Sequence, residues 1–164
     1  MSTRSAIGIE QQNGSVKVVY CHSDGYPRHN GKMLLEHYNS AEKANSIVKL
    51  GDLSYLDKSI EKPTGHTFEK PVDGYSIFYK RDRGEQGGTA VVFNSIKSVF
   101  NELDSDYVYI FKPKENAWYY AKHDSKELKP LTKNVVEGDY KDGGAIKGDK
   151  KFDYNKLNYT IGGL

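Results

Sequence analysis

The chain has 164 residues and a net charge of +2, from 24 basic and 22 acidic side chains. This length suits one domain with a hydrophobic core, and the balanced charge gives no electrostatic reason to expect nucleic acid as a partner. One cysteine excludes an internal disulfide, and no apolar stretch approaches the roughly 20 residues that a membrane helix needs. We therefore expect a cytoplasmic protein with no membrane partner.

The first predicted element is a β-hairpin. Segments 4–11 and 15–21 alternate apolar and polar residues on either side of Asn13-Gly14, a strong two-residue turn signal. With this turn, Arg4 would lie opposite Ser23. The N-terminal residues would then meet the polar segment that follows the second strand. A shift of one residue would undo this pairing.

Helical patterns follow the hairpin. A short helix is predicted over 31–38, and Ser40 is a typical N-cap for a second helix that ends at Gly51. The later elements are an irregular connection over 52–73, a strand over Tyr75–Lys80, a helix over about 94–103, and a hairpin formed by Tyr107–Phe111 and Ala117–Ala121.

This order of elements predicts an α+β fold. We expect a mostly antiparallel sheet of about four or five strands, with two or three helices packed on one side. Residues 1–136 are predicted to form a single α+β domain. Residues 137–164 form a C-terminal segment rich in Gly, Lys and Asp. Its first part, 137–151, is predicted to be a mobile loop, and 152–161 an edge strand.

The richest polar segment is Cys21-His22-Ser23-Asp24-Gly25-Tyr26-Pro27, with His29 just beyond it. It lies between a predicted strand and a predicted helix, at the rim of the sheet, where ligands commonly bind. Asp24, Gly25 and Pro27 are also typical turn residues. His22 and Tyr26 are harder to explain as turn residues, so they are stronger candidates for binding, together with Asp24 and His29.

Two chemical alternatives exist for this segment. Cys21, His22, Asp24 and His29 belong to the residue types that bind zinc. Adjacent side chains in a strand point to opposite faces, however, and no second cysteine pair completes a site. Cys21 could instead act as a nucleophile beside a histidine, against the simpler interpretation of a packed thiol. We expect no metal and no cofactor, and we assign no catalytic residue.

A second candidate cluster is Arg81-Asp82-Arg83-Gly84-Glu85. Arg81 and Arg83, two positions apart on an extended strand, would point to the same side. Two adjacent guanidinium groups suit the recognition of phosphate or carboxylate. The alternative is a solvated loop with internal ion pairs.

Four segments together resemble a family of small tailed-phage proteins, over roughly residues 1–122. They are Met1-Ser2-Thr3-Arg4-Ser5-x-Ile7-Gly8, Tyr20-Cys21-His22-x-Asp24-Gly25-Tyr26-Pro27, Leu50-Gly51-Asp52-Leu53-Ser54 and Tyr79-x-Arg81-Asp82-Arg83-Gly84-Glu85. One departure is Ser23, where many relatives have an aromatic residue. The resemblance implies a phage protein in the cytoplasm of the infected bacterial host. Small phage proteins of this kind are often counter-defence factors, which is an argument by association.

We combine these observations in one functional hypothesis. The protein would bind and sequester a small anionic, nucleotide-derived immune signalling molecule. The contacts would come from Arg4, His22, Asp24, Tyr26, His29, Arg81 and Arg83. One alternative is an inhibitor that binds a host defence or metabolic protein. A second is a small phosphodiesterase or nuclease, which the lack of clustered metal-binding carboxylates disfavours, so we expect a binding protein rather than an enzyme. A homo-oligomer is a further partner to consider.

Overall fold

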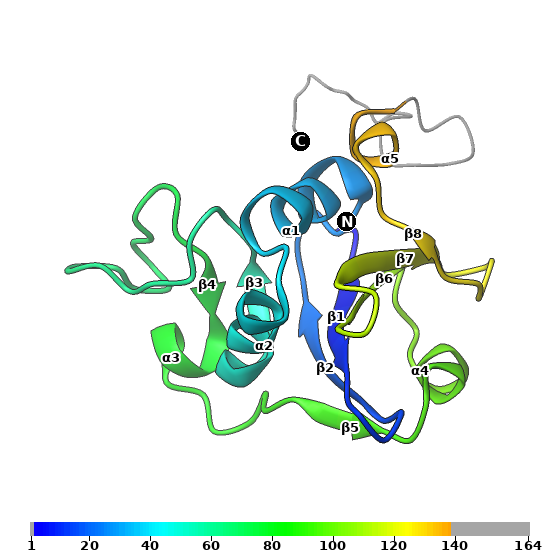
Figure 1. Cartoon of the computed structure of the whole chain (residues 1–164). Helices are drawn as coiled ribbons and strands as arrows, with labels where there is room; N and C mark the ends of the chain where they lie inside the picture. Colours follow the sequence, from blue (N-terminus) through cyan, green and yellow to red (C-terminus); the bar gives the residue numbers. More distant parts are fainter. Residues whose placement is uncertain (1, 139–164) are drawn as a thin grey trace.

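The computed structural model describes residues 2–138, which are built around one eight-stranded sheet (Figure 1). The strand order is β4-β3-β2-β1-β6-β7-β8, and β5 pairs separately with β2. The strands are β1 (Ser5–Glu10), β2 (Val16–Cys21), β3 (Leu53–Tyr55), β4 (Ile77–Phe78), β5 (Val91–Phe93), β6 (Tyr107–Lys112), β7 (Ala117–Lys122) and β8 (Lys129–Pro130). The helices are a π-helix, η1 (Pro27–Gly31), and α1 (Lys32–His37), α2 (Ala41–Leu50), α3 (Tyr79–Arg83), α4 (Ile96–Glu102) and α5 (Lys133–Glu137).

The α+β class predicted from the sequence is confirmed, but the sheet is larger than predicted. It has eight strands instead of four or five. Among the described residues, five of the seven strand pairings are antiparallel, while β1–β6 and β2–β3 are parallel. The missed strands β3, β5 and β8 have only two or three residues each, which is too short for an alternating pattern to appear in the sequence.

The register of the first hairpin differs by one residue from the prediction. Ser5 pairs with Cys21, because the loop contains Gln12 as well as Asn13 and Gly14. The Gln11 amide donates to the Ser15 carbonyl at 2.7 Å, and Gly14 has a φ of +90°. A three-residue hairpin loop needs a glycine in the left-handed conformation at this position. The Asn13-Gly14 pair therefore belongs to a three-residue loop, and not to the predicted two-residue loop. Arg4 therefore lies beside His22, and not opposite Ser23.

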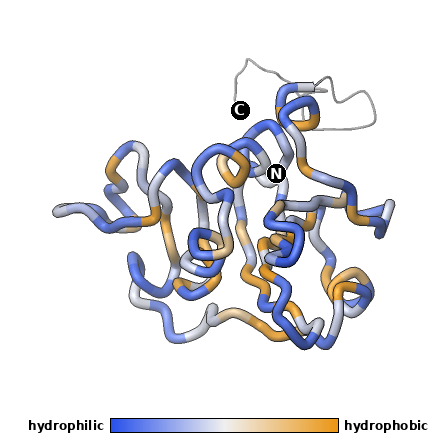
Figure 2. The backbone as a smooth tube through the Cα atoms, viewed as in Figure 1, coloured by the Kyte–Doolittle hydropathy of each residue, from blue (hydrophilic) through white to orange (hydrophobic). Residues whose placement is uncertain are grey.

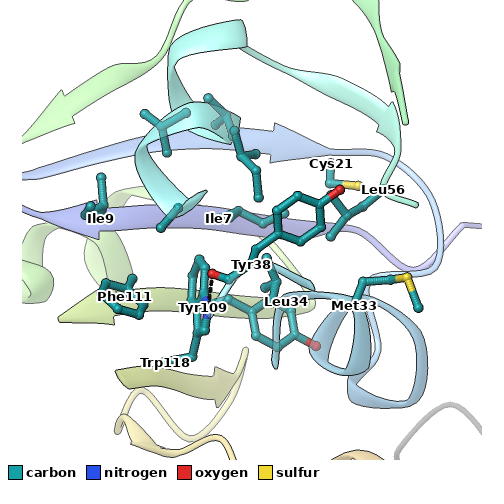
Figure 3. Packing of buried hydrophobic residues seen from close by; sticks show 14 of the residues in the cluster. Ile7, Ile9, Cys21, Met33, Leu34, Tyr38, Leu56, Tyr109, Phe111 and Trp118 are labelled. Atoms are coloured by element: carbon teal, nitrogen blue, oxygen red, sulfur yellow. Dashed lines mark hydrogen bonds between the residues drawn. The ribbon is translucent and has the colours of Figure 1, made fainter. Parts of the chain in front are cut away.

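Two cores lie on the two faces of the sheet, which corrects the expectation that the helices pack on one side. On the first face, α1 and α2 cover β1, β2 and β6, and their buried side chains meet those of the strands. Figure 3 shows Ile7, Tyr109 and Phe111 of the strands packed against Leu34 and Tyr38. On the second face, Val99 of α4 packs with Val18 and Ile110 in a smaller core. Figure 2 shows the hydrophobic residues gathered on the central strands and the hydrophilic ones in the loops.

Helix α2 illustrates how local sequence sets an element of this fold. The Ser40 hydroxyl accepts a hydrogen bond from the Lys43 amide at 3.1 Å, as predicted for an N-cap. Ala44, Ile47 and Val48 form the buried stripe that faces the sheet. The helix ends at Leu50, and the cap residue Gly51 follows it with a φ of +92°, which is unfavourable for other residues.

The C-terminal part of the description ends with α5. Glu137, predicted as the first residue of a mobile loop, is the last residue of this helix, and Val136 joins the core under α1. Residues 139–151 of the predicted loop and the predicted edge strand over 152–161 lie outside the described residues. Among residues 2–138, no helix combines the length and the apolar composition needed to cross a membrane.

Candidate functional site

The segment that follows β2 forms a tight turn against the N-terminal strand. The His22 and Ser23 amides donate to the carbonyls of Leu53 and Ser54 at 3.0 Å, which prolongs the pairing with β3. The chain then turns at Asp24, which has a φ of +53°, and the Gly25 amide donates to the Thr3 carbonyl at 2.8 Å. Asp24 and Gly25 therefore have a clear architectural role.

Tyr26 and His29 also make contacts within the protein. The Tyr26 hydroxyl donates to Asp24 Oδ1 at 3.2 Å, and its ring packs partly buried against the core under α1 and α2. Nε2 of His29 lies 2.8 Å from the Leu56 carbonyl oxygen, and its ring packs against the Tyr55 ring at a tilt of 30°, with centroids 4.9 Å apart. Both side chains thus belong to the side of the sheet that carries α1 and α2.

Cys21 is a buried thiol. Its Sγ donates to the Ser23 carbonyl at 3.6 Å, and Asn30 Nδ2 donates to Sγ at 3.4 Å. Burial raises the pKa of the Cys21 thiol to about 11, although the hydrogen bond from Asn30 acts in the opposite direction. A thiol with this pKa stays protonated at neutral pH. Its burial and protonation therefore disfavour the alternative in which Cys21 acts as a nucleophile.

Arg81 and Arg83 do not lie on a strand, which corrects the sequence prediction. The strand ends at Phe78, and both arginines belong to the short helix α3. Two positions on a helix are separated by about 200°, so their side chains diverge.

Arg81 turns towards the loop between β3 and β4. Its Nε donates to Asp82 Oδ1 at 2.8 Å, Nη1 to the Ile60 carbonyl at 2.5 Å, and Nη2 to the Ser76 carbonyl at 3.3 Å. The guanidinium also lies 4.9 Å from the centre of the Phe78 ring. Its donors are committed to protein acceptors, so we assign Arg81 to structure and not to ligand binding.

Arg83 lies on the surface of α3. Its guanidinium is 4.2 Å from the centre of the Phe68 ring and 5.0 Å from that of Tyr79, and it pairs with the Glu85 carboxylate. Its side chain is 42% exposed. This arginine therefore matches the alternative of an internal ion pair within a charged surface segment.

We expect Arg83→Ala to change the free energy of unfolding by about 1 kcal/mol or less, because exposed ion pairs and exposed cation–π contacts contribute little. Urea unfolding followed by circular dichroism measures this. A loss several times larger would show that the contacts with Phe68, Tyr79 and Glu85 hold α3 in place.

A polar surface that we call the Tyr20 surface lies on the second face of the sheet. It consists of Arg4, Tyr20, His22, Asp52 and Tyr79. The Tyr20 hydroxyl and His22 Nδ1 are 2.6 Å apart, and the Arg4 side chain is exposed beside them. The Tyr20 pKa is raised by burial, the Arg4 charge lowers it in part, and Tyr79 and Asp52 raise it further. Arg4, Asp52 and Tyr79 are thus close enough to the Tyr20 hydroxyl to influence its ionisation.

Asp52 holds this surface together. Its Oδ1 accepts from the Tyr20 amide at 2.8 Å, its amide donates to the Gly88 carbonyl, and its carbonyl accepts from the Tyr79 amide. Asp52 lies beside the part of β2 that is left between Val18, which pairs with β5, and Cys21, which pairs with β3. Burial raises the Asp52 pKa, and the Tyr20 amide offsets part of this effect.

A small cavity opens next to Tyr20. It has a volume of about 150 Å³ and is lined by Ala6, Val18, Tyr20, Asp52, Val91 and Leu103 among others. Aromatic, carboxylate and nearby guanidinium groups around an apolar floor can bind a ligand that has both a flat ring and an anionic group.

A larger pocket, of about 460 Å³, lies at the other end of the sheet, between the β1–β2 loop, the start of α2 and the β6–β7 loop. Its charged side chains are Glu10, Glu42 and Lys114, two acids and one base. This balance does not favour an anion. In the part of the chain described, no group of three or more metal-ligating side chains is placed to hold a metal ion.

The structure therefore separates the seven predicted binding residues into three places. Arg4 and His22 meet on the Tyr20 surface. The turn and η1 hold Asp24, Tyr26 and His29, while α3 holds Arg81 and Arg83.

Sequence reasoning missed Tyr20, Asp52 and Tyr79. All three residues stand in segments that carry the resemblance stated above, but nothing in the local pattern around them indicated a binding role.

Comparisons with known proteins gave no match: no protein-family model, no curated protein and no solved structure is similar to this chain.

Proposed function

We propose that the protein is a tailed-phage accessory protein, in the cytoplasm of the infected host, that binds and sequesters a small anionic, nucleotide-derived immune signalling molecule. The observation that supports this most is the Tyr20 surface. It places an exposed arginine and a phenol–imidazole pair beside a cavity on one face of the sheet. The resemblance to tailed-phage proteins supplies the biological setting.

The groups on this surface match different parts of a nucleotide. The Arg4 guanidinium can donate two parallel hydrogen bonds to a phosphate. Tyr20 and Tyr79 offer flat faces for a base, and ring stacking tolerates any base. The Asp52 carboxylate can accept hydrogen bonds from a base amino group or a ribose hydroxyl. We therefore move the proposed contacts away from Arg81 and towards Tyr20 and Asp52.

Each of the two candidate histidines uses one ring nitrogen within the protein. His22 Nδ1 contacts the Tyr20 hydroxyl, and His29 Nε2 contacts the Leu56 carbonyl. A general base must reach the proton that it removes, so the phosphodiesterase alternative would have to use the other ring nitrogen, Nε2 of His22 or Nδ1 of His29.

We expect Arg4→Ala to weaken nucleotide binding about tenfold or more, because a guanidinium–phosphate pair is charge-assisted and bidentate. Binding should also weaken as salt rises. Titration calorimetry against a panel of linear and cyclic nucleotides, at two salt concentrations, measures both effects. Lys49→Ala, an equal loss of charge on the exposed side of α2, is the matched control and should leave binding unchanged.

The identity of the released ligand separates the three functional hypotheses. The protein is incubated with extract of infected cells, repurified and denatured, and the released nucleotides are identified by mass. An intact nucleotide supports sequestration, whereas a cleaved one supports the phosphodiesterase alternative. No heat with any member of the panel, together with a stable complex with a host protein on gel filtration, would replace the proposal with the inhibitor alternative.

A further inference from the structure

Strand β5 has an open edge. It pairs antiparallel with the first half of β2, and among residues 2–138 no strand pairs with its other side. The backbone amide and carbonyl groups of alternate residues on such an edge point outward without a strand partner. In Figure 1, β5 lies at the lower rim of the molecule.

The same strand has the most exposed apolar side chains. Val91 and Val92 are 56% and 58% exposed, and they are the large apolar side chains of the described chain that are classed as exposed. Val91 pairs with Val18 and Val92 with Lys17, so the two valines point to opposite faces of the sheet. The two valines, as well as the edge, are therefore open to a partner, whereas Phe93 is buried in the smaller core. Figure 2 shows this stretch as hydrophobic.

The charge pattern around β5 favours an identical strand as the partner. Residues 86–96 contain no charged residue and no proline. Charges, especially lysine, and prolines are the usual devices that protect an edge strand from pairing. Two copies of one strand, paired antiparallel, bring like residues close together, and like charges there would repel. Because residues 86–96 carry no charge, two copies of β5 can pair without this repulsion.

We propose that β5 pairs antiparallel with β5 of a second copy, which joins the two sheets into one across a two-fold axis. Such an interface is isologous, with the same patch used by both subunits. Because each copy contributes only a short strand, we expect a dimer that forms reversibly with concentration.

The dimer has a consequence for the Tyr20 surface, and this consequence rests on the proposed function. A two-fold axis perpendicular to the joined sheet keeps equivalent faces on the same side. The two β2 strands would then be three strand spacings apart, about 14 Å. Val91 lines the cavity beside Tyr20, so the second copy would approach the open side of that cavity. Two Tyr20 surfaces would thus face the same way and could share a ligand with two anionic ends.

Analytical ultracentrifugation of the full chain tests the dimer. The average mass should rise from that of one 18.5 kDa chain towards twice that value as the protein concentration increases from about 1 to 200 µM, a range suited to a small interface. V92K should raise the dissociation constant at least about tenfold, since it places two like charges close to the two-fold axis. Its melting temperature should fall only slightly, because Val92 is exposed and the new repulsion within one copy is limited to Lys17, its partner on β2.

N45K is the matched control, because it adds the same charge at an exposed position of α2 in the layer away from β5. It should dimerise like the wild type. A wild-type protein that stays monomeric at the highest concentration overturns the proposal. This holds also if another segment of the same chain covers the edge of β5. Equal dissociation constants for the V92K and N45K dimers would also overturn it. The result is independent of the nucleotide titration, since a monomer can bind nucleotide and a dimer can fail to bind it.

Discussion

Asp82→Asn is expected to lower the free energy of unfolding by about 3–5 kcal/mol, because it removes one partner of a buried charged cluster. The Asp82 side chain is fully buried. Its Oδ1 accepts from Arg81 Nε at 2.8 Å and from Lys62 Nζ at 3.1 Å, and its Oδ2 accepts from the Phe78 amide at 2.8 Å. Asparagine has a similar shape, but its amide group cannot satisfy these donors.

The loss would spread beyond α3, because Asp82 also binds β4 through the Phe78 amide and the β3–β4 loop through Lys62. Arg81 and Asp82 begin the chain that leads from β4 to β5, while Lys62 and His66 belong to the loop between β3 and β4. His66 is buried, and its Nε2 lies 3.1 Å from the Ser76 carbonyl oxygen and 3.4 Å from Asp82 Oδ2. Without the carboxylate, a largely buried guanidinium loses its counter-ion.

Acid should reveal the same cluster in the wild type. Burial alone would raise the Asp82 pKa, but the hydrogen bonds from Arg81, the Phe78 amide and Lys62 outweigh it and lower the pKa to about 2. A carboxyl with a lowered folded-state pKa stabilises the protein above its unfolded pKa, near 4, and loses this contribution as the pH falls towards 2. Asp82→Asn should lack that component of the acid transition.

Urea unfolding at neutral pH and at a series of pH values down to about 2 measures both effects. Glu85→Gln is the matched control, because it removes the charge of the neighbouring pair with Arg83, whose side chains are 42% and 39% exposed. It should cost about 1 kcal/mol or less. Equal losses in the two variants would show that the buried cluster contributes no more than a surface pair.

The elements with strong local signals were predictable from the sequence. The N-cap at Ser40, the buried stripe of α2 and the β6–β7 hairpin follow from capping and alternation, and each lies within a few residues of its predicted position. The helix predicted over about 94–103 is α4. In these places local preference and tertiary packing agree.

The misses share a physical cause. Strands β3 and β5 have three residues each, and their hydrogen bonds depend on β2, which is distant in the chain. The stretch over Tyr75–Lys80 was predicted to be one strand, but the Asp82 carboxylate binds the Phe78 amide and α3 starts at Tyr79 instead. The placement of Arg81 depended on the carbonyls of Ile60 and Ser76, which no local pattern connects to it. The register error in the first hairpin came from one extra loop residue.

The candidate site shows the same limit. Polar residues after β2 were a sound indication of a tight turn, and Arg4 was predicted to come near His22. The aromatic and acidic members of the Tyr20 surface come from β2, the start of β3 and α3, which only the folded sheet brings together. Residue chemistry suggested candidates, whereas their grouping depended on strand order.

Gly25→Ala is the second substitution with a large expected effect, and it connects the turn to the candidate site. A Cβ at position 25 would lie 2.8 Å from the carbonyl carbon and oxygen of Arg4 and from the Ser5 Cβ. The glycine cannot move away easily, because its amide binds the Thr3 carbonyl and its own carbonyl accepts from the buried Tyr109 hydroxyl at 2.6 Å. Forcing a methyl group into such a contact costs about 1–3 kcal/mol.

The same strain would displace the backbone of Arg4, so Gly25→Ala should also weaken any ligand bound between Arg4 and His22. Gly87→Ala is the matched control: a Cβ there meets no atom within 4 Å, and the backbone φ is not in the left-handed region. It should be neutral or stabilise by up to about 1 kcal/mol, by restricting the unfolded chain. Thermal unfolding of both variants, followed by the nucleotide titration, separates the two effects. If Gly25→Ala is as stable as Gly87→Ala, the turn is not locked against β1. If it is destabilised yet binds like the wild type, the Tyr20 surface does not depend on the position of Arg4, and the ligand contacts must be sought elsewhere.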